Sequence, residues 1–196
     1  LIKSGAGFAA RAVRESLQAF MQFENAMHEV WTLTDVGYES MVRLGREVRN
    51  FAVQYAVDAT DAARALYMTI SAGIGQTDPA EGFLAMSEAM KFGKATMTSA
   101  AQSVDLMTTV LNAYSLEATD AAYVSDVLFK TIKMGKTTGP ELALSFGRVA
   151  SMAAAAAIPL EDMAAATVAL TRAGLKTDEA MTALRQVINK IVNPTE

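Results

Sequence analysis

Residues 135–162, which run GKTTGPELALSFGRVASMAAAAAIPLED, carry the signals that decide the fold. The glycine at 135 stands where a left-handed residue would close a helix. Thr138-Gly139-Pro140-Glu141 then offers a capping threonine, an early proline and a glutamate that can bond back to the cap. A segment of helical length follows, and Pro159 marks the next start, with Glu161 close behind it. The stretch therefore predicts one short helix, a tight connection and the beginning of another helix.

Similar helix start and end signals recur along the chain from residue 58 onward. Asp78-Pro79-Ala80-Glu81 has the same capping residue, early proline and glutamate as residues 138–141. Markers of helix starts follow one another at about 20 residues: Thr60, Thr77, Thr98, Thr119, Thr138, Pro159 and Thr177. Glycines that would close helices are Gly73, Gly93, Gly135 and Gly174. We therefore expect about seven helices of about 12 to 17 residues in this part of the chain.

The two stretches before residue 58 have a different pattern of apolar and polar residues. Apolar residues recur at three- and four-residue steps over residues 5–32 and again over residues 35–57, which predicts two long amphipathic helices. We expect residues 1–57 to form a helical arm or hairpin and residues 58–196 to form a multi-helix core domain. The apolar stripes of the two long helices fit burial against each other in one chain, and they fit an intermolecular coiled coil equally well.

No segment alternates apolar and polar residues with period two, so the fold class is all-α, with two long N-terminal helices followed by an array or bundle of about seven shorter ones. The regular spacing favours helices that stack in pairs, as in an irregular solenoid. A compact orthogonal bundle remains the alternative, because the spacing is a repeat of caps and lengths only.

Composition narrows the function classes. Of the 196 residues, 52% are hydrophobic and only 7% aromatic, with 12 methionines, which suits helix-on-helix packing. Disulfides, thiolate metal sites and cysteine nucleophiles are excluded because the chain has no cysteine. The net charge of -4 argues against a nucleic-acid-binding domain. The chain begins at Leu1, and we expect it to be a piece of a longer polypeptide.

Residues that could carry chemistry are few. The only histidine, His28, lacks a second histidine for a zinc-protease helix, since position 32 is threonine. Gly135-Lys136-Thr137 resembles the end of a phosphate-binding loop, but position 130 is lysine instead of the required glycine. Gly73-Ile74-Gly75 is a pair of glycines without a third. We interpret both glycine segments as turns and expect no catalytic, cofactor-binding or metal-binding residues.

The charged residues have a structural interpretation. Carboxylates gather near predicted helix starts, where the helix dipole favours negative charge: Asp58, Asp61, Asp78, Glu81, Asp120, Glu161, Asp162, Asp178 and Glu179. Two basic stripes, Lys91 with Lys94 and residues 130, 133 and 136, lie near predicted helix ends. They fit solvated helix ends, or contact with an acidic partner or a nucleic-acid backbone. The apolar run at residues 149–160 is too short to span a bilayer, and we expect a buried Ala-rich helix there.

The order of segments along the chain resembles the conserved core region of bacteriophage tail tape-measure proteins, from about Phe8 to Thr195. The segments that carry the resemblance are Phe23-Glu24-Asn25-Ala26-Met27, Ala62-Ala63-Arg64-Ala65-Leu66, Leu111-Asn112-Ala113-Tyr114, Asp126-Val127-Leu128-Phe129, Ile158-Pro159-Leu160-Glu161-Asp162, Ala169-Leu170-Thr171-Arg172-Ala173-Gly174 and Asn193-Pro194-Thr195. Each segment alone is unspecific, so the resemblance rests on their order and spacing.

The resemblance implies a virion component of the tail lumen or tail tip, present in the host cytoplasm during assembly. Its implied functions are to help determine tail length, to organise tail assembly and to support DNA ejection. Implied partners are copies of itself, as a trimer or hexamer, the tail tube protein, tail tip or baseplate proteins, assembly chaperones and, during ejection, the host membrane. It implies no catalytic residues, no cofactor and no sequence-specific nucleic-acid binding.

Because helix starts recur about every 20 residues, we expect this segment to be a folded or stacked block. The rod that measures tail length would then lie elsewhere in the parent chain. Two other function classes remain. A helical-repeat protein-binding adaptor module would show the same regular caps. A hydrolase of the cell wall would need a cleft with paired carboxylates.

Overall fold

The computed structural model describes the backbone of residues 3–193 and the side chains of residues 11–193. Within that range the chain forms α-helices, one short 3-10 helix and their connections, and no strand. The elements are α1 (Lys3–Thr32), α2 (Tyr38–Tyr55), α3 (Ala59–Ser71), α4 (Pro79–Thr96), α5 (Ala100–Ala113), η1 (Ala118–Asp120), α6 (Ala121–Met134), α7 (Gly139–Ala155), α8 (Leu160–Arg172) and α9 (Thr177–Val192). The all-α prediction is confirmed. Pro194, Thr195 and the side chain of Phe8, which belong to the family resemblance, lie outside the described residues.

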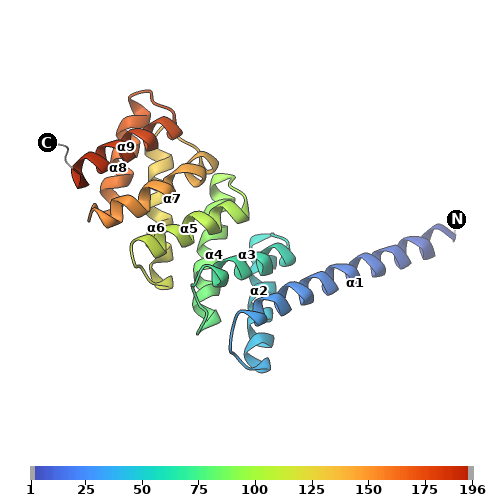
Figure 1. The fold of residues 1–196 in the computed structure, drawn as a ribbon. Helices are drawn as coiled ribbons and strands as arrows, with labels where there is room; N and C mark the ends of the chain where they lie inside the picture. Colours follow the sequence, from blue (N-terminus) through green and yellow to red (C-terminus); the bar gives the residue numbers. More distant parts are fainter. Residues whose placement is uncertain (1–2, 194–196) are drawn as a thin grey trace.

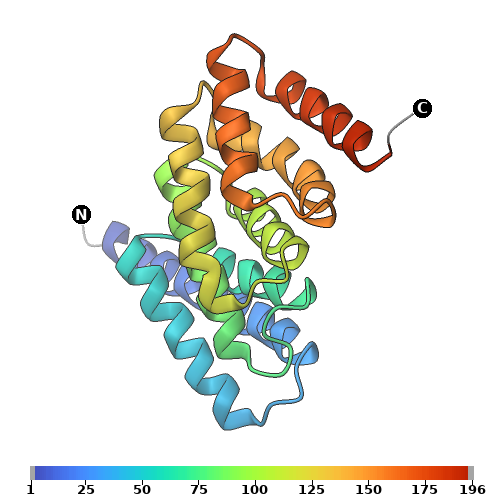
Figure 2. The same ribbon diagram turned by 90° about the vertical axis from the view of Figure 1, so that its left-hand side faces the viewer.

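The helices are stacked in two layers. In one layer α1 packs on α3, α3 on α5, α5 on α7 and α7 on α9, while in the other α2 packs on α4, α4 on α6 and α6 on α8. Figures 1 and 2 show the stack running from the blue α1–α2 end to the red α8–α9 end. The described residues therefore form an α-helical solenoid, and the orthogonal bundle is not observed.

The structural repeat is a pair of helices, about 40 residues long. Buried side chains recur at this spacing in both layers. In the first layer they are Leu66 on α3, Met107 on α5 and Phe146 on α7, and in the second layer they are Met86 on α4, Val124 on α6 and Met163 on α8. The spacing of about 20 residues between helix starts is half of this repeat. The repeat is hard to see in sequence because the layers accept different apolar side chains at equivalent positions.

Long-range hydrogen bonds link each repeat to the next. The bonded residues are 35 to 40 positions apart in the chain. The bonds run from Lys94 Nζ to the Tyr55 carbonyl, from Asn112 Nδ2 to the Ala72 carbonyl (2.9 Å), from the Lys136 N–H to Thr171 Oγ1 (3.1 Å) and from Thr177 Oγ1 to Thr137 Oγ1 (2.8 Å). Each bond ties a helix end or connection to its counterpart in the neighbouring repeat.

The two strongest predicted helix starts are confirmed. Thr138 Oγ1 accepts a hydrogen bond from the Glu141 N–H, and Glu141 Oε2 accepts one from the Thr138 N–H at 2.9 Å. At α4, Asp78 Oδ1 accepts from the Ala80 N–H at 3.0 Å, and Pro79 is the first helical residue.

Several other starts are displaced by one or two residues from the predicted threonine. Asp58, rather than Thr60, caps α3, and Ser99, rather than Thr98, caps α5. Both threonines are buried instead, so the cap falls to the exposed neighbour whose oxygen reaches the free N–H groups.

Two predicted helix ends differ from the structure. Gly93 lies inside α4, which continues to Thr96, and Met97 takes the left-handed conformation with φ 55°. A Cβ at Gly93 would collide with the Ser103 hydroxyl, so this glycine allows α4 and α5 to approach closely. Gly135 does end α6, but in an extended conformation with φ -89° and ψ 179°.

The alanine-rich run at residues 149–160 is not one helix. α7 ends at Ala155, and Ala157 takes a left-handed conformation with φ 54°. The Ile158 N–H bonds back to the Ala153 carbonyl at 2.9 Å, which satisfies a free carbonyl at the helix end. Because proline disfavours a helical conformation in the preceding residue, Pro159 enforces the break before α8.

Helix α1 has a packed half and a free half. Phe23, Met27 and Val30 are buried and belong to the same hydrophobic core as Leu66 of α3. The part before Phe23 projects beyond the stack, as Figure 1 shows in dark blue. The apolar stripe of α1 is therefore buried within the chain only over its C-terminal half. The division between residues 1–57 and 58–196 stays a prediction.

Candidate functional site

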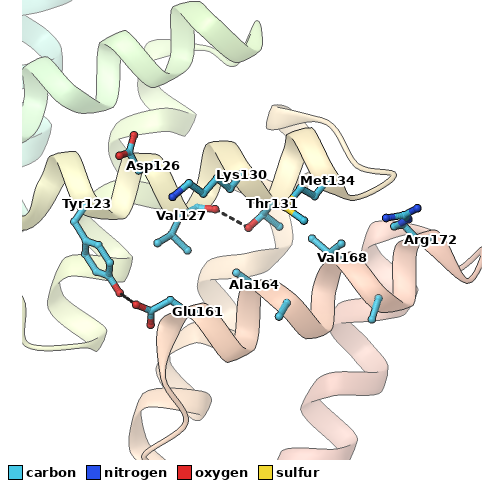
Figure 3. A pocket seen from close by; sticks show the side chains of 12 residues that line it. Tyr123, Asp126, Val127, Lys130, Thr131, Met134, Glu161, Ala164, Val168 and Arg172 are labelled. Carbon is cyan, nitrogen blue, oxygen red and sulfur yellow. Dashed lines mark hydrogen bonds between the residues drawn. The ribbon is translucent and has the colours of Figure 1, made fainter.

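An apolar groove of about 510 Å³ lies between α6 and α8. We call it the α6–α8 groove (Figure 3). On the α6 side it is lined by Tyr123, Asp126, Val127, Lys130, Thr131 and Met134, and on the α8 side by Glu161, Ala164, Ala165, Val168, Ala169 and Arg172. Its middle is apolar, and its charged groups lie along the edges.

Small side chains explain why the groove is open. α8 contributes Ala164, Ala165, Val168 and Ala169, which lie on one face at steps of three and four residues. Longer apolar side chains at these positions would fill the space between α6 and α8. α6 and α8 occupy the same layer and run side by side, so the groove extends along both helices.

The charges of the groove are separated along its length. Asp126 and Glu161 come from the first halves of α6 and α8, whereas Arg172 is the last residue of α8 and Lys130 lies beyond Asp126 on α6. From Glu161 to Arg172 the helix rises by about 16 Å. The groove therefore has an acidic end and a basic end.

A hydrogen bond crosses the groove at its acidic end. Tyr123 Oη donates to Glu161 Oε1 at 2.5 Å. Burial, together with this bond and the charge of Glu161, raises the pKa of Tyr123 to about 12. The same bond lowers the pKa of Glu161 below its ordinary value. Glu161 is therefore ionised and Tyr123 neutral at neutral pH.

The neighbouring Tyr114 is half-buried. Burial raises the pKa of Tyr114 to about 12. Among the residues that the structure describes, its hydroxyl has no hydrogen-bond partner. At neutral pH both tyrosines keep their protons and Glu161 has already lost its own, so no carboxyl with a raised pKa is found among the described residues here to act as a general acid. The groove is suited to bind an apolar helix face rather than to transfer protons.

His28 is exposed on α1, with its ring edge-on to Trp31 at 6.1 Å between centroids. Both residues line a smaller hollow between α1 and α2. Arg49 crosses this hollow, 5.1 Å from the Phe23 ring and 3.5 Å from a Glu24 oxygen. His28 therefore lies on the surface of α1.

The two glycine segments are turns, as predicted. Gly135-Lys136-Thr137 connects α6 to α7, and its N–H and hydroxyl groups contact Thr171 and Thr177. These donors and acceptors are therefore used between repeats. Gly73-Ile74-Gly75 follows α3, with Ile74 buried and both glycines at positive φ.

The carboxylates lie at helix starts, as predicted. Asp58 and Asp78 cap α3 and α4, and Asp120 accepts from the Glu117 N–H at 2.9 Å. Glu161 and Asp162 occupy the first turn of α8. Within residues 11–193 no group of three or more histidine, aspartate or glutamate side chains is arranged to hold a metal ion.

The two basic stripes differ. Lys91 bonds Glu88 Oε1 at 2.6 Å, which raises the lysine pKa, and its ammonium lies 5.4 Å from the Tyr55 ring centroid. Lys94 donates to the Tyr55 carbonyl. This pair therefore ties α4 to α2. In the other stripe Lys130 lines the α6–α8 groove and Lys133 lies in the last turn of α6.

The groove itself was not predicted from sequence. Its signal is the run of small residues on one face of α8, but such a face also fits a tightly packed helix pair. None of the helices in the described part of the chain is both long and apolar enough to cross a membrane.

Sequence similarity links the chain to phage tail proteins. A family model described as phage-related minor tail protein matches residues 39–196. The chain is 25% identical over 190 residues to a tape measure protein of Pneumococcus phage Dp-1, an alignment that covers 97% of this chain and 16% of that protein. It is 27% identical over 160 residues to a probable tape measure protein of Clostridium phage phiCD119, covering 81% of this chain and 17% of that protein. The chain thus spans about a sixth of the length of these relatives, and no solved structure matches it.

Proposed function

We propose that this chain, which belongs to the phage-related minor tail protein family, is a tape-measure segment that lies in the tail tube lumen or at the tail tip. There it helps to determine tail length, to organise tail assembly and to support DNA ejection. The observation that carries the proposal is the alignment with a tape measure protein over 97% of the chain, from α1 to α9.

The architecture supports a docking block within such a protein. A solenoid exposes long helix faces to partners, whereas a single rod offers only a narrow stripe. Here the exposed features are the free half of α1 and the α6–α8 groove. We place the measuring rod in other parts of the parent chain.

The proposed partners follow from this placement. They are copies of the chain itself, as a trimer or hexamer, the tail tube protein, tail tip or baseplate proteins, assembly chaperones and, during ejection, the host membrane. We propose no catalytic step, no cofactor and no sequence-specific nucleic-acid contact. The net charge of -4 supports the last point, because a chain of negative charge is repelled by a phosphate backbone.

Peptide mass spectrometry on purified virus particles tests the location. Peptides from this chain are expected in intact particles, protected from added protease, and are expected to be lost or exposed after triggered DNA release. The tail tube protein serves as the matched control, since its peptides should remain in both samples. Absence of the chain from intact particles would overturn the proposal.

The α6–α8 groove also favours a second candidate, a helical-repeat adaptor that binds a soluble helical peptide. Particle composition separates the two candidates, because an adaptor without a tail function would be found in the infected cell and not in the purified particle.

A further inference from the structure

Two surfaces on this chain are apolar and unpartnered within residues 11–193. One is the α6–α8 groove. The other is the free half of α1, where Val13, Leu17, Phe20 and Met21 are 68%, 57%, 55% and 55% exposed. Their steps of three and four residues place them on one helix face. Exposed apolar patches of this kind mark protein interaction sites.

The free helix cannot fill the groove of its own chain. α1 packs on α2 and α3 at one end of the solenoid, whereas α6 and α8 lie two and three repeats further along the stack. Figure 1 shows the free half of α1 pointing away from α6 and α8. Any contact between the two surfaces therefore joins two copies.

The apolar stripe is short enough to lie within the groove. From Val13 to Met21 it covers about 12 Å of helix. The groove runs from Glu161 to Arg172, about 16 Å. Its alanine-lined middle leaves room for a large side chain, and Phe20, near the C-terminal end of the exposed stripe, is the largest side chain of the stripe.

The charges agree in order. Arg14 follows Val13 in the N-terminal part of the apolar stripe of α1, and Glu24 follows the stripe on its C-terminal side. The groove presents Asp126 and Glu161 toward one end and Arg172 at the other, with Lys130 between them on α6, one turn after Asp126. A helix lying parallel to α6 and α8 would bring Arg14 to the acidic end and Glu24 toward Arg172. Such pairing sets the direction of the bound helix more than its affinity.

We propose that the free half of α1 of one copy docks in the α6–α8 groove of a second copy. The contact is heterologous, since it joins two different surfaces, and it closes into a ring or continues as a filament. A coiled coil between free halves of α1 is the other arrangement that an exposed apolar stripe allows, and the variants below separate the two. This inference rests on the self-association included in the proposed function and specifies its geometry.

The test uses two variants of the whole 196-residue chain, each with one surface blocked. Phe20→Glu blocks the free helix, and Ala165→Glu places a charge in the groove. Both positions are exposed, so the fold should survive, as circular dichroism would verify. Light scattering across a concentration series gives the mass. The unmodified chain is expected to rise above its monomer mass of 20.8 kDa, and each variant alone to stay at that mass.

Mixing the two variants gives the decisive measurement. Phe20→Glu retains a working groove and Ala165→Glu retains a working helix, so the mixture is expected to form a 1:1 complex of twice the monomer mass and to stop there. A mixture that stays monomeric overturns the proposal. So does self-association of Ala165→Glu alone, because that outcome means that α1 pairs without the groove. An unmodified chain that stays monomeric throughout also overturns it.

Two further variants control the interpretation. Val187→Glu changes an exposed apolar residue on α9 and is expected to leave the association unchanged; loss of association there would place the contact on a different face. Arg14→Glu is expected to weaken the complex several-fold, and adding Asp126→Arg to the same chain is expected to restore it. Failure of this restoration would refute the parallel orientation. None of these results depends on where the chain lies in a particle, so they can fail separately from the tail location.

Discussion

Replacing Phe146 by alanine tests whether the solenoid is held together locally, by packing between neighbouring repeats. Phe146 lies on α7 and is fully buried. α7 packs on α5 on one side and on α9 on the other, so the phenyl ring belongs to the contact between repeats.

The magnitude follows from burial and from the space left behind. Truncation of a buried phenylalanine costs about 3 to 5 kcal/mol, because transfer free energy is lost and the cavity collapses only in part. Small residues around the site, such as Ala150 and Ala153 on the same helix, cannot extend into the cavity. We therefore expect a loss in the upper half of that range.

Urea denaturation followed by circular dichroism measures the free energy of unfolding, and native-state hydrogen exchange locates the loss. Leu144→Ala is the matched control, because Leu144 lies on the same helix and is 62% exposed; it should cost below about 1 kcal/mol. In Phe146→Ala, amides of α7 and α9 should exchange faster while those of α3 keep their protection. A cost similar to that of Leu144→Ala, or an equal loss of protection in α3, would refute the local account of stability.

Three other outcomes are expected. Tyr114→Phe should leave the free energy of unfolding unchanged or raise it in thermal or urea melts, because it removes a buried hydroxyl that has no partner within residues 11–193; a loss above about 1 kcal/mol would reveal a partner. Ala157→Gly should stabilise the chain by up to about 1 kcal/mol, because glycine takes the left-handed conformation of this position without strain. Ala169→Gly, inside α8, should instead destabilise the chain by about 1 kcal/mol. The same melts compare the two variants. In an absorbance titration, the difference between the unmodified chain and Tyr123→Phe should show Tyr123 ionising near pH 12. Glu161→Ala should lower this pKa only in part, because burial is the largest cause of the shift. Because the pKa of Tyr123 is raised on folding, its contribution to stability is present below about pH 10 and is lost as the pH rises toward 12.

Much of the fold could be predicted because a helix start is determined by a few neighbouring residues. Thr138 and Glu141 meet within one turn, so their reciprocal bonds depend on nothing outside residues 138–141. Helix ends were harder. Ala56, Met97, Ser115 and Ala157 take left-handed conformations that glycine usually supplies, because tertiary packing outweighs a local penalty of about 1 to 2 kcal/mol.

Gly93 shows the opposite case, in which a glycine is needed for packing against another helix and not for a helix end. A glycine near the end of an apolar segment predicts a helix end, but here it admits the Ser103 hydroxyl of the next helix. The α6–α8 groove could not be predicted either, because it also depends on how two helices pack. Ala164, Ala165 and Ala169 fit a closely packed pair as well as an open groove, and only the spacing of α6 and α8 decides between them.

The solenoid also bears on how such a segment would act as a ruler. A continuous helix of 40 residues spans about 60 Å, because each residue adds about 1.5 Å. One repeat of this solenoid uses about the same number of residues but advances by about 10 Å, the distance between packed helices. The 30 residues of α1, by contrast, span about 45 Å. Residues added to the stacked part would therefore change a tail length far less than residues added to a continuous helix. This supports the proposal that tail length is measured outside α2–α9 and that this block joins one chain to its neighbours.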